Sequence, residues 1–449
     1  MSRHVLRWLA GVALFAVGCS THAQRLHGVR DAFYSGDLAT AELKIDEGAK
    51  KKAGEADVLE LDRAAVLLTA GKPREAEQVL RKVRDQFDQF EQKDAAEGVL
   101  AMLTDDQALA YAGDDHEKVL IRVYLALANL LGDGGDAAAY ALQVADKQRQ
   151  IIDKGAQPDG KNPKQGYAQV AVGAYLHAAL REATHQNYDD AARSLQLVCQ
   201  WEPAFAPGKA DLDRVKQGHH SGKGNGVLYL FTLVGRGPYK EEKLEIPSTA
   251  ALLVADRILS IAGKRSLPPT VAPIKVPCVV RPVNVVQAVA VNVDGVQRGQ
   301  TATLTDVGRL ATQQAEAMHP YVLGRAIARR VVKKGAVYAV KEVTKQQKGD
   351  LSNLALDVAG VVWEATESAD TRCWGLLPDK IQVLRLELPA GSHQITLQPV
   401  AGDGRPCGPA ETTAVEVRDG RNSYALANFP TSRLVGAVVT SDRPAPRRR

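Results

Sequence analysis

The sequence contains none of the short motifs that identify familiar catalytic, metal or phosphate sites. No G-x-S-x-G, H-E-x-x-H or C-x-x-C pattern occurs, and these are the patterns that position a nucleophilic serine, a catalytic zinc or a redox pair. The glycine-rich run at 222–226 precedes a predicted strand, whereas a phosphate-binding loop follows a strand and opens a helix. Gly263-Lys264-Arg265 lacks the Ser or Thr that would bind Mg²⁺. We therefore predict a non-enzymatic protein with no catalytic residue, cofactor or metal.

The chain also lacks a large net charge once its two ends are set aside. The formal charge of +5 depends on six arginines, two within residues 1–18 and four in a basic tail at 442–449. Without these six, the 57 basic residues fall to 51, against 52 acidic ones. A nucleic-acid partner therefore has no global electrostatic support. The 45% hydrophobic content excludes disordered and fibrous classes, and 449 residues predict two or three domains.

The N-terminal apolar run is too short for an ordinary membrane-spanning helix, which needs about 20 residues. Residues 1–18 are instead typical of a secretory signal peptide, because Arg3 and Arg7 frame the start of a short apolar region. The run Ala16-Val17-Gly18-Cys19 resembles the bacterial lipobox, in which the cysteine is lipidated, although leucine is usual in place of the alanine. A plain signal peptide with an incidental cysteine is the alternative.

Lipidation of Cys19 would leave residues 19–23 as a short tether before the first predicted helix. Such a tether reaches less than about 20 Å. Ser20, and not Asp, follows the cysteine, which by resemblance to lipoprotein sorting favours the outer membrane. We expect a lipid-anchored protein of the bacterial cell envelope that faces the periplasm.

A short pattern, in which alanine follows a glycine by five residues, recurs along the first half of the chain. It occurs at 36–41, 71–76 and 132–137, and again at 186–191 without the glycine. Glycine supplies the left-handed end of one helix, and Asp, Asn or Pro opens the next, so each copy predicts a helix–turn–helix pair. The first two copies lie 35 residues apart, close to the tetratricopeptide (TPR) period of 34. We predict a TPR-like helical array over residues 24–217, with a generic helical bundle as the alternative.

One stretch carries a family resemblance. Residues 115–130, DHEKVLIRVYLALANL, resemble the same region in a family of bacterial lipoproteins without an assigned activity. The resemblance continues at 226–245 and 369–397. It implies a TPR-like N-terminal half and a mixed, β-rich C-terminal domain, and it supplies no catalytic residues.

The second half of the chain is typical of strands with helices between them. After a linker at 218–226, a β-rich domain is predicted at 227–441, with a helical insertion at about 306–368 in which Pro320 separates helices 306–318 and 321–346. The pattern at 388–397, LPAGSHQITL, resembles sandwich modules called PEGA. The predicted fold class is multidomain, α followed by α+β, with a β-sandwich-like second domain. Strands are predicted at 227–234, 244–246, 274–280, 285–293, 381–388, 393–399, 412–418, 423–429 and 434–440. Helices are also predicted at 250–262, capped by Ser248, and at 352–368 within the insertion.

Two groups of side chains are candidates for special roles. Cys373 and Cys407 are a candidate disulfide. Cys199 is expected to be buried on the apolar face of the last helix of the array, and Cys278 has no assigned role. A basic stripe on the predicted helix at 321–346 is a candidate contact for an anionic glycan or lipid surface, with a solvated helix face as the alternative. The stripe comprises Arg325, Arg329, Arg330, Lys333 and Lys334.

The function predicted from these observations is a membrane-anchored scaffold that binds a protein partner through its helical array, within residues 24–213. The alternatives are a binder of envelope glycan or anionic lipid surfaces and an enzyme of unrecognised type. His219-His220 is interpreted as part of a solvated linker, because adjacent histidines need further partners to hold a metal.

Overall fold

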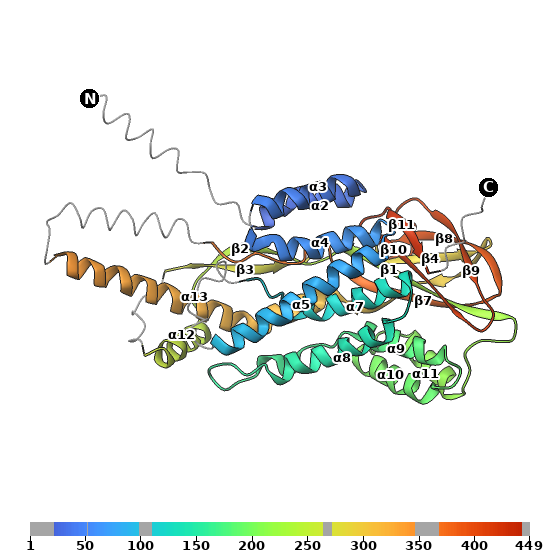
Figure 1. The fold of residues 1–449 in the computed structure, drawn as a ribbon, viewed down its shortest axis with the longest axis horizontal. Coiled ribbons are helices and arrows are strands. Elements are labelled where there is room, and N and C mark those ends of the chain that lie inside the picture. The colour runs from blue at the N-terminus through green and yellow to red at the C-terminus, as the bar shows by residue number, and fades with distance from the viewer. Residues whose placement is uncertain (1–21, 52, 98–109, 264–271, 346–367, 442–449) are drawn as a thin grey trace, which may run out of the picture.

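The structure is a computed structural model that describes residues 22–51, 53–97, 110–263, 272–345 and 368–441. Helices occupy its first part, and strands predominate from residue 225 onward (Figure 1). The predicted order of an α-helical half followed by a mixed α+β half is therefore confirmed. Cys19, the signal peptide, the basic tail and nearly all of the predicted helix at 352–368 lie outside the described residues.

The helical half consists of helix pairs joined by short turns. Each of the four predicted repeats falls on the turn within one pair, so these turns are confirmed. The pairs are α2 (His22–Ser35) with α3 (Leu38–Lys51), α4 (Ala56–Thr69) with α5 (Pro73–Glu97), α7 (Asp115–Gly132) with α8 (Ala137–Asp153), and α9 (Ala171–Glu182) with α10 (Tyr188–Trp201); α11 (Pro207–Lys216) follows, and the short η1 (Ala53–Glu55) and η2 (Pro163–Gly166) lie between pairs.

The turns differ from the prediction in one detail. Gly36 and Gly71 adopt the expected left-handed conformation, with φ of 89° and 75°. In the third pair, however, Gly132 is the last residue of α7, and Gly134 is the left-handed residue. The reason is a hydrogen bond from the Gly134 backbone N–H to the Asn129 carbonyl (2.8 Å), which closes the turn two residues later than predicted.

The strands form three sheets. The five-stranded sheet has the order β11-β10-β1-β7-β6, a four-stranded sheet has the order β5-β4-β8-β9, and β2 pairs with β3 alone. The strands are β1 (Asn225–Arg236), β2 (Tyr239–Glu245), β3 (Ile274–Val280), β4 (Ala288–Val293), β5 (Val296–Gln300), β6 (Ala302–Asp306), β7 (Pro378–Pro389), β8 (Gly391–Val400), β9 (Glu411–Val417), β10 (Asn422–Phe429) and β11 (Val435–Thr440).

Strand β1 is at the centre of the structure, and both of its faces are covered. Tyr229 and Phe231 lie in an apolar core that is shared with the helical half. Leu228 and Leu230 lie in a second apolar core, which the five-stranded sheet shares with the four-stranded one. Because neighbouring side chains of a strand point to opposite faces, burial on both sides explains the continuous apolar run that predicted a central strand.

The helical half and the five-stranded sheet are not separated by a solvated linker. His220, within the predicted linker, is buried, and its Nε2 lies 2.7 Å from Oδ1 of Asn422 on β10. The backbone carbonyl of the same histidine accepts a hydrogen bond from Arg385 on β7. The interpretation of this histidine as part of a solvated linker is therefore wrong, because His220 packs against β10 and β7, the two strands that flank β1 in the sheet.

The helical insertion begins with one long helix where two were predicted. Helix α13 (Val307–Lys345) continues through Pro320. Proline removes one helical hydrogen bond and usually breaks or kinks a helix. Here the helix is packed on both sides of the proline. Before it, Leu310 lies in the apolar core that the sheet shares with the helical half. After it, Leu323 and Ile327 pack against β3 and helix α12 (Thr249–Ile261). These contacts stabilise the helix on both sides of Pro320, so that α13 continues through it.

We expect Leu228→Ala to lower the free energy of unfolding by about 2–5 kcal/mol, because it removes a fully buried side chain from between two sheets. The matched control is Leu244→Ala on β2, where the leucine is 63% exposed and the change should stay within about 0.5 kcal/mol. Urea unfolding followed by circular dichroism measures both. Equal effects of the two substitutions would contradict this packing of the sheets.

Candidate functional site

An extended segment that precedes β7, residues 369–377, lies buried among helices of the first half. We call it the inserted segment; its side chains from Thr371 to Leu377 are all buried. The backbone N–H of Ala23 donates to Oγ1 of Thr371 (3.4 Å), and Arg372 donates to the carbonyl of Gly54 (3.1 Å). An irregular segment can be buried only if its backbone polar groups find partners.

Two buried carboxylates on helices supply those partners. Oε1 of Glu117 on α7 accepts the backbone N–H of Trp374 (2.7 Å), and Oδ1 of Asp62 on α4 accepts that of Leu376 (2.9 Å). Between them, the Trp374 ring is completely buried and lies 4.8 Å from the ring of Tyr124, centroid to centroid. Burial raises the pKa of Asp62 well above its ordinary range. The inserted segment is therefore fixed to the helices through its backbone.

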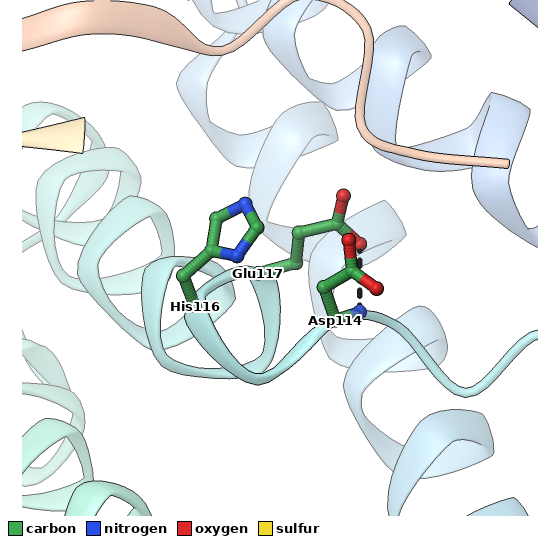
Figure 2. Close-up of side chains that lie close together, drawn as sticks. All are labelled: Asp114, His116 and Glu117. Carbon is green, nitrogen blue, oxygen red and sulfur yellow. Dashed lines mark hydrogen bonds between the residues drawn. The ribbon is translucent and has the colours of Figure 1, made fainter. Parts of the chain in front are cut away.

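The start of α7 gathers several charged groups at the same place. Figure 2 shows Asp114, His116 and Glu117 side by side, with the Asp114 backbone N–H donating to Oε2 of Glu117 (3.1 Å). The Tyr111 hydroxyl donates to the same oxygen (2.6 Å), and Nζ of Lys240 on β2 lies 2.7 Å from each Asp114 carboxylate oxygen. This arrangement is a capping box that also binds the neighbouring strand.

Burial and the nearby Lys240 shift the pKa values of the two acids in this cap. Burial and the neighbouring Asp114 charge raise the pKa of Glu117. Burial alone would also raise the pKa of Asp114, but the Lys240 ammonium outweighs it and lowers that pKa.

The existing contacts of these side chains show whether the cap could hold a metal ion. Asp114, His116 and Glu117 each offer a ligand atom, and these atoms lie within 4.8 Å of one another. However, both oxygens of Glu117 already accept hydrogen bonds, and both oxygens of Asp114 face an ammonium group. A cation would have to displace Lys240 and compete with backbone donors. The contacts therefore fit a structural cap better than a metal centre.

A third buried carboxylate joins the other end of the helical half to the sheet. Glu182 on α9 is 1% exposed. Its carboxylate accepts from the Tyr229 hydroxyl (2.9 Å) and forms ion pairs with Arg214 of α11 (2.8 Å) and Arg385 of β7 (3.3 Å). Sequence analysis missed all three acids. The local sequence gives no clear signal for them, because Asp62 lies beside Arg63 and Glu117 lies between His116 and Lys118, in stretches that also carry other charges.

The main cavity in the described part of the chain lies where the two halves meet. It has a volume of about 490 Å³ and lies between the start of α7, the β2–β3 pair and the first part of α13. Its walls mix apolar and ionisable side chains, and most of the latter are paired: Lys240 with Asp114, Lys164 with Asp115 at 2.7 Å, and His319 with Glu245 at 2.7 Å.

A second hollow, the charged groove, lies on the outer side of the helical half between α5, α7 and α8. Its volume is about 390 Å³. Lys147 and Arg122 both pair there with Asp88, at 2.8 and 2.7 Å, and Lys147 also pairs with Glu91 at 2.5 Å. The groove is lined by Arg84, Asp85, Asp88, Arg122, Gln143, Asp146, Lys147 and Gln150.

A scan against protein-family models, a search of curated proteins and a search of solved structures each find no match to this chain. Among the described helices, none is both long enough and apolar enough to cross a membrane.

The two cysteines of the candidate disulfide are free thiols in the structure. Cys373 is buried beside Glu117, and burial raises the pKa of its thiol to about 12. Cys407 instead lies in the turn after β8, where its backbone N–H donates to the Pro399 carbonyl (3.0 Å). The predicted bridge is not formed, because the cysteine of the inserted segment faces the helical half whereas Cys407 packs against the core between the sheets.

The basic stripe on α13 is not a continuous exposed face. Arg330 is buried, and its guanidinium donates to the Pro273 carbonyl (2.8 Å). Arg325 lines the main cavity, and Arg329 and Lys333 are half-buried. The side chain of Lys334 lies outside the described residues. The prediction that these five residues contact one surface together is therefore wrong for Arg330.

We expect Glu117→Gln to lower the free energy of unfolding by about 1–3 kcal/mol. The amide replaces one acceptor oxygen with an NH₂ group, which cannot accept from Tyr111, from Asp114 or from Trp374. The control is Glu75→Gln on α5, where the side chain is 59% exposed and the effect should be within about 0.5 kcal/mol. Urea unfolding followed by tryptophan fluorescence measures both variants. An unchanged unfolding midpoint for Glu117→Gln would show that Glu117 does not anchor the inserted segment.

Stability should also depend on pH through Glu55. Burial alone would raise its pKa, but hydrogen bonds from His22 and Arg25 outweigh burial and hold the pKa at about 2, below the ordinary 4.5. Because the pKa of Glu55 is lower in the folded state than in the unfolded one, its ionised carboxylate stabilises the folded protein at pH values above 4.5. This contribution to the free energy of unfolding is lost as the pH falls toward 2 and the carboxylate is protonated. Urea unfolding at several pH values in this range should show that the free energy of unfolding falls more steeply with decreasing pH for the wild type than for Glu55→Gln. The same pH dependence in both proteins would contradict the lowered pKa of Glu55.

Proposed function

We propose that this protein is a non-enzymatic lipoprotein of the bacterial cell envelope that holds a protein partner at the outer membrane. The observation that carries the proposal is the pairing of ionisable groups around its main cavity, such as Lys240 with Asp114 and Lys164 with Asp115. A catalytic site needs an activated nucleophile or base within reach of a substrate. Mutually paired charges instead stabilise the walls of a binding surface.

A lipid anchor at Cys19 would place the protein directly on the membrane. Helix α2 begins at His22, only three residues after the cysteine, and such a span reaches about 10 Å. His22 is itself buried and contacts Glu55 at 3.0 Å. The family resemblance supports the same assignment, and the short tether favours a fixed assembly site over a protein that reaches across the periplasm.

The proposal includes a TPR-like array and a sandwich-like second half. The alanine of each repeat is completely buried in all four pairs, as expected where a second helix packs closely on the first. These alanines are Ala41, Ala76, Ala137 and Ala191. The shared apolar core between the five-stranded and four-stranded sheets supports a sandwich-like arrangement.

The docking surface for the partner is proposed to be the outer side of the helical half, with the charged groove at its centre. The inner apolar side is already packed against the sheet and the inserted segment. The exposed carboxylates of Asp85 and Asp146 lie at this groove beside Arg84 and Arg122. Binding of an anionic glycan or lipid surface through α13 has less support, because the basic stripe is interrupted.

Capture of the partner from intact envelopes tests this function. Chemical crosslinking and affinity purification of the full chain should recover one main protein, and the double variant Asp85→Lys/Asp146→Lys should reduce recovery at least tenfold. Asp403→Lys, in an equally exposed loop, is the control and should leave recovery unchanged. Cys19→Ala should release the protein from the membrane fraction. Failure of the wild type to recover any protein would refute the scaffold role.

Deletion of the helical half would not be a clean test of docking. Tyr229, Phe231 and Val383 on the sheet are buried against the helices, so removal of the helices would expose an apolar face and destabilise the remaining domain. Surface substitutions avoid this problem.

A further inference from the structure

We propose that the main cavity between α7, β3 and α13 binds an extended peptide of about six residues that carries at least one lysine or arginine. This inference rests on the proposed function, because the peptide would be a segment of the partner protein. The cavity would then be a second contact, distinct from the charged groove on the outer side of the helical half.

The shape of the cavity fits an extended chain. Its volume of about 490 Å³ lies within the usual range for ligand sites. Its α13 wall runs from Ala311 to Arg325, which corresponds to about 21 Å of helix, or about six residues of extended peptide. Ala311, Ala315, Met318 and Val322 line this wall at intervals of three or four residues, so they form one apolar stripe.

Three polar side chains on the cavity walls make no hydrogen bond or ion pair with another residue in the described part of the chain. His116 is 6% exposed, lines the cavity and makes no hydrogen bond with the described residues. The Oε1 atom of Gln314 is buried and has no partner. Glu316 is exposed on the same wall and makes no ion pair with the described residues. A peptide backbone offers both the N–H donor and the carbonyl acceptor that the glutamine and the histidine need.

The balance of charge favours a basic peptide. The lining contains the carboxylates of Asp114, Asp115, Glu245 and Glu316, against the cations Lys164, Lys240 and Arg325. Three of these carboxylates already face a cation or a histidine within the cavity. Glu316 alone is left to receive the charge of a ligand, and a lysine or arginine side chain supplies it.

Other ligand classes fit the walls less well. An acyl chain would remove water from charged groups without replacing their hydrogen bonds, which costs free energy. A phosphate group needs unpaired cations, whereas Lys164 and Lys240 are each held by a carboxylate. Arg325 is not without a partner either. A peptide satisfies the polar walls and covers the apolar stripe at the same time.

A library of hexapeptides with blocked ends, screened against the purified full chain without its signal peptide, tests the proposal. The wild type should select peptides with Lys or Arg at one fixed position. Glu316→Lys should reverse this selection toward Asp or Glu and weaken binding of the best basic peptide at least tenfold. Glu75→Lys, on an exposed site of α5, is the charge control and should leave binding unchanged.

A second variant blocks the cavity by size. Ala315→Trp should abolish peptide binding, whereas Ala250→Trp at an exposed position of α12 should not. If Ala315→Trp fails to fold, Glu316→Lys on the surface still decides the question. Absence of any selected peptide, selection that neither variant changes, or binding of palmitate or inorganic phosphate in its place would overturn the proposal. Partner capture from envelopes that continues despite such a result would leave the scaffold function intact.

Discussion

The structure depends on buried carboxylates that hold the inserted segment and the central sheet against the helices. Asp62 and Glu117 accept backbone N–H groups of the inserted segment, and Glu182 accepts from Tyr229 and pairs with Arg385. A buried carboxylate without partners is strongly destabilising, so each acid requires its own donor in place. The two halves therefore stabilise each other, and the shared apolar core makes them one structural unit.

This arrangement restricts where a partner can bind. The helices direct their apolar sides inward, onto β1, β7 and the inserted segment, which leaves polar surfaces outside. In the part of the chain that the structure describes, the charged groove and the main cavity both combine size with polar side chains. Their mutually paired charges, and the three-residue spacing in the sequence between Cys19 and the first residue of α2, support the proposed binding protein at a membrane surface.

Much of the local structure follows directly from the sequence. The continuous apolar run at 227–234 predicts a central strand, and Ser248 predicts the cap of α12, where its Oγ accepts the Ala251 N–H (3.3 Å). Strands β5 and β6 were missed, because their residues are mostly polar and β5 is largely exposed. Pro320 predicted a break that packing on both sides of α13 overcomes. The candidate site was missed almost entirely. An acid at a helix start, such as Glu117, is usually explained by the helix dipole, and the local sequence does not mark Asp62 within α4 or Glu182 at the end of α9 as buried.

The sequence by itself determined the four helix pairs, the order of the two halves and the alternation of strands and turns. These features depend on residues close together in the chain, such as glycine at a turn and alanine five residues later. Tertiary structure alone decided that Glu117, Asp62 and His220 are buried and that Arg330 is bonded to backbone. Periodicity shows which side of a helix is apolar. However, the donors that satisfy a buried acid lie up to 314 residues away in the chain, and only the folded structure brings them together.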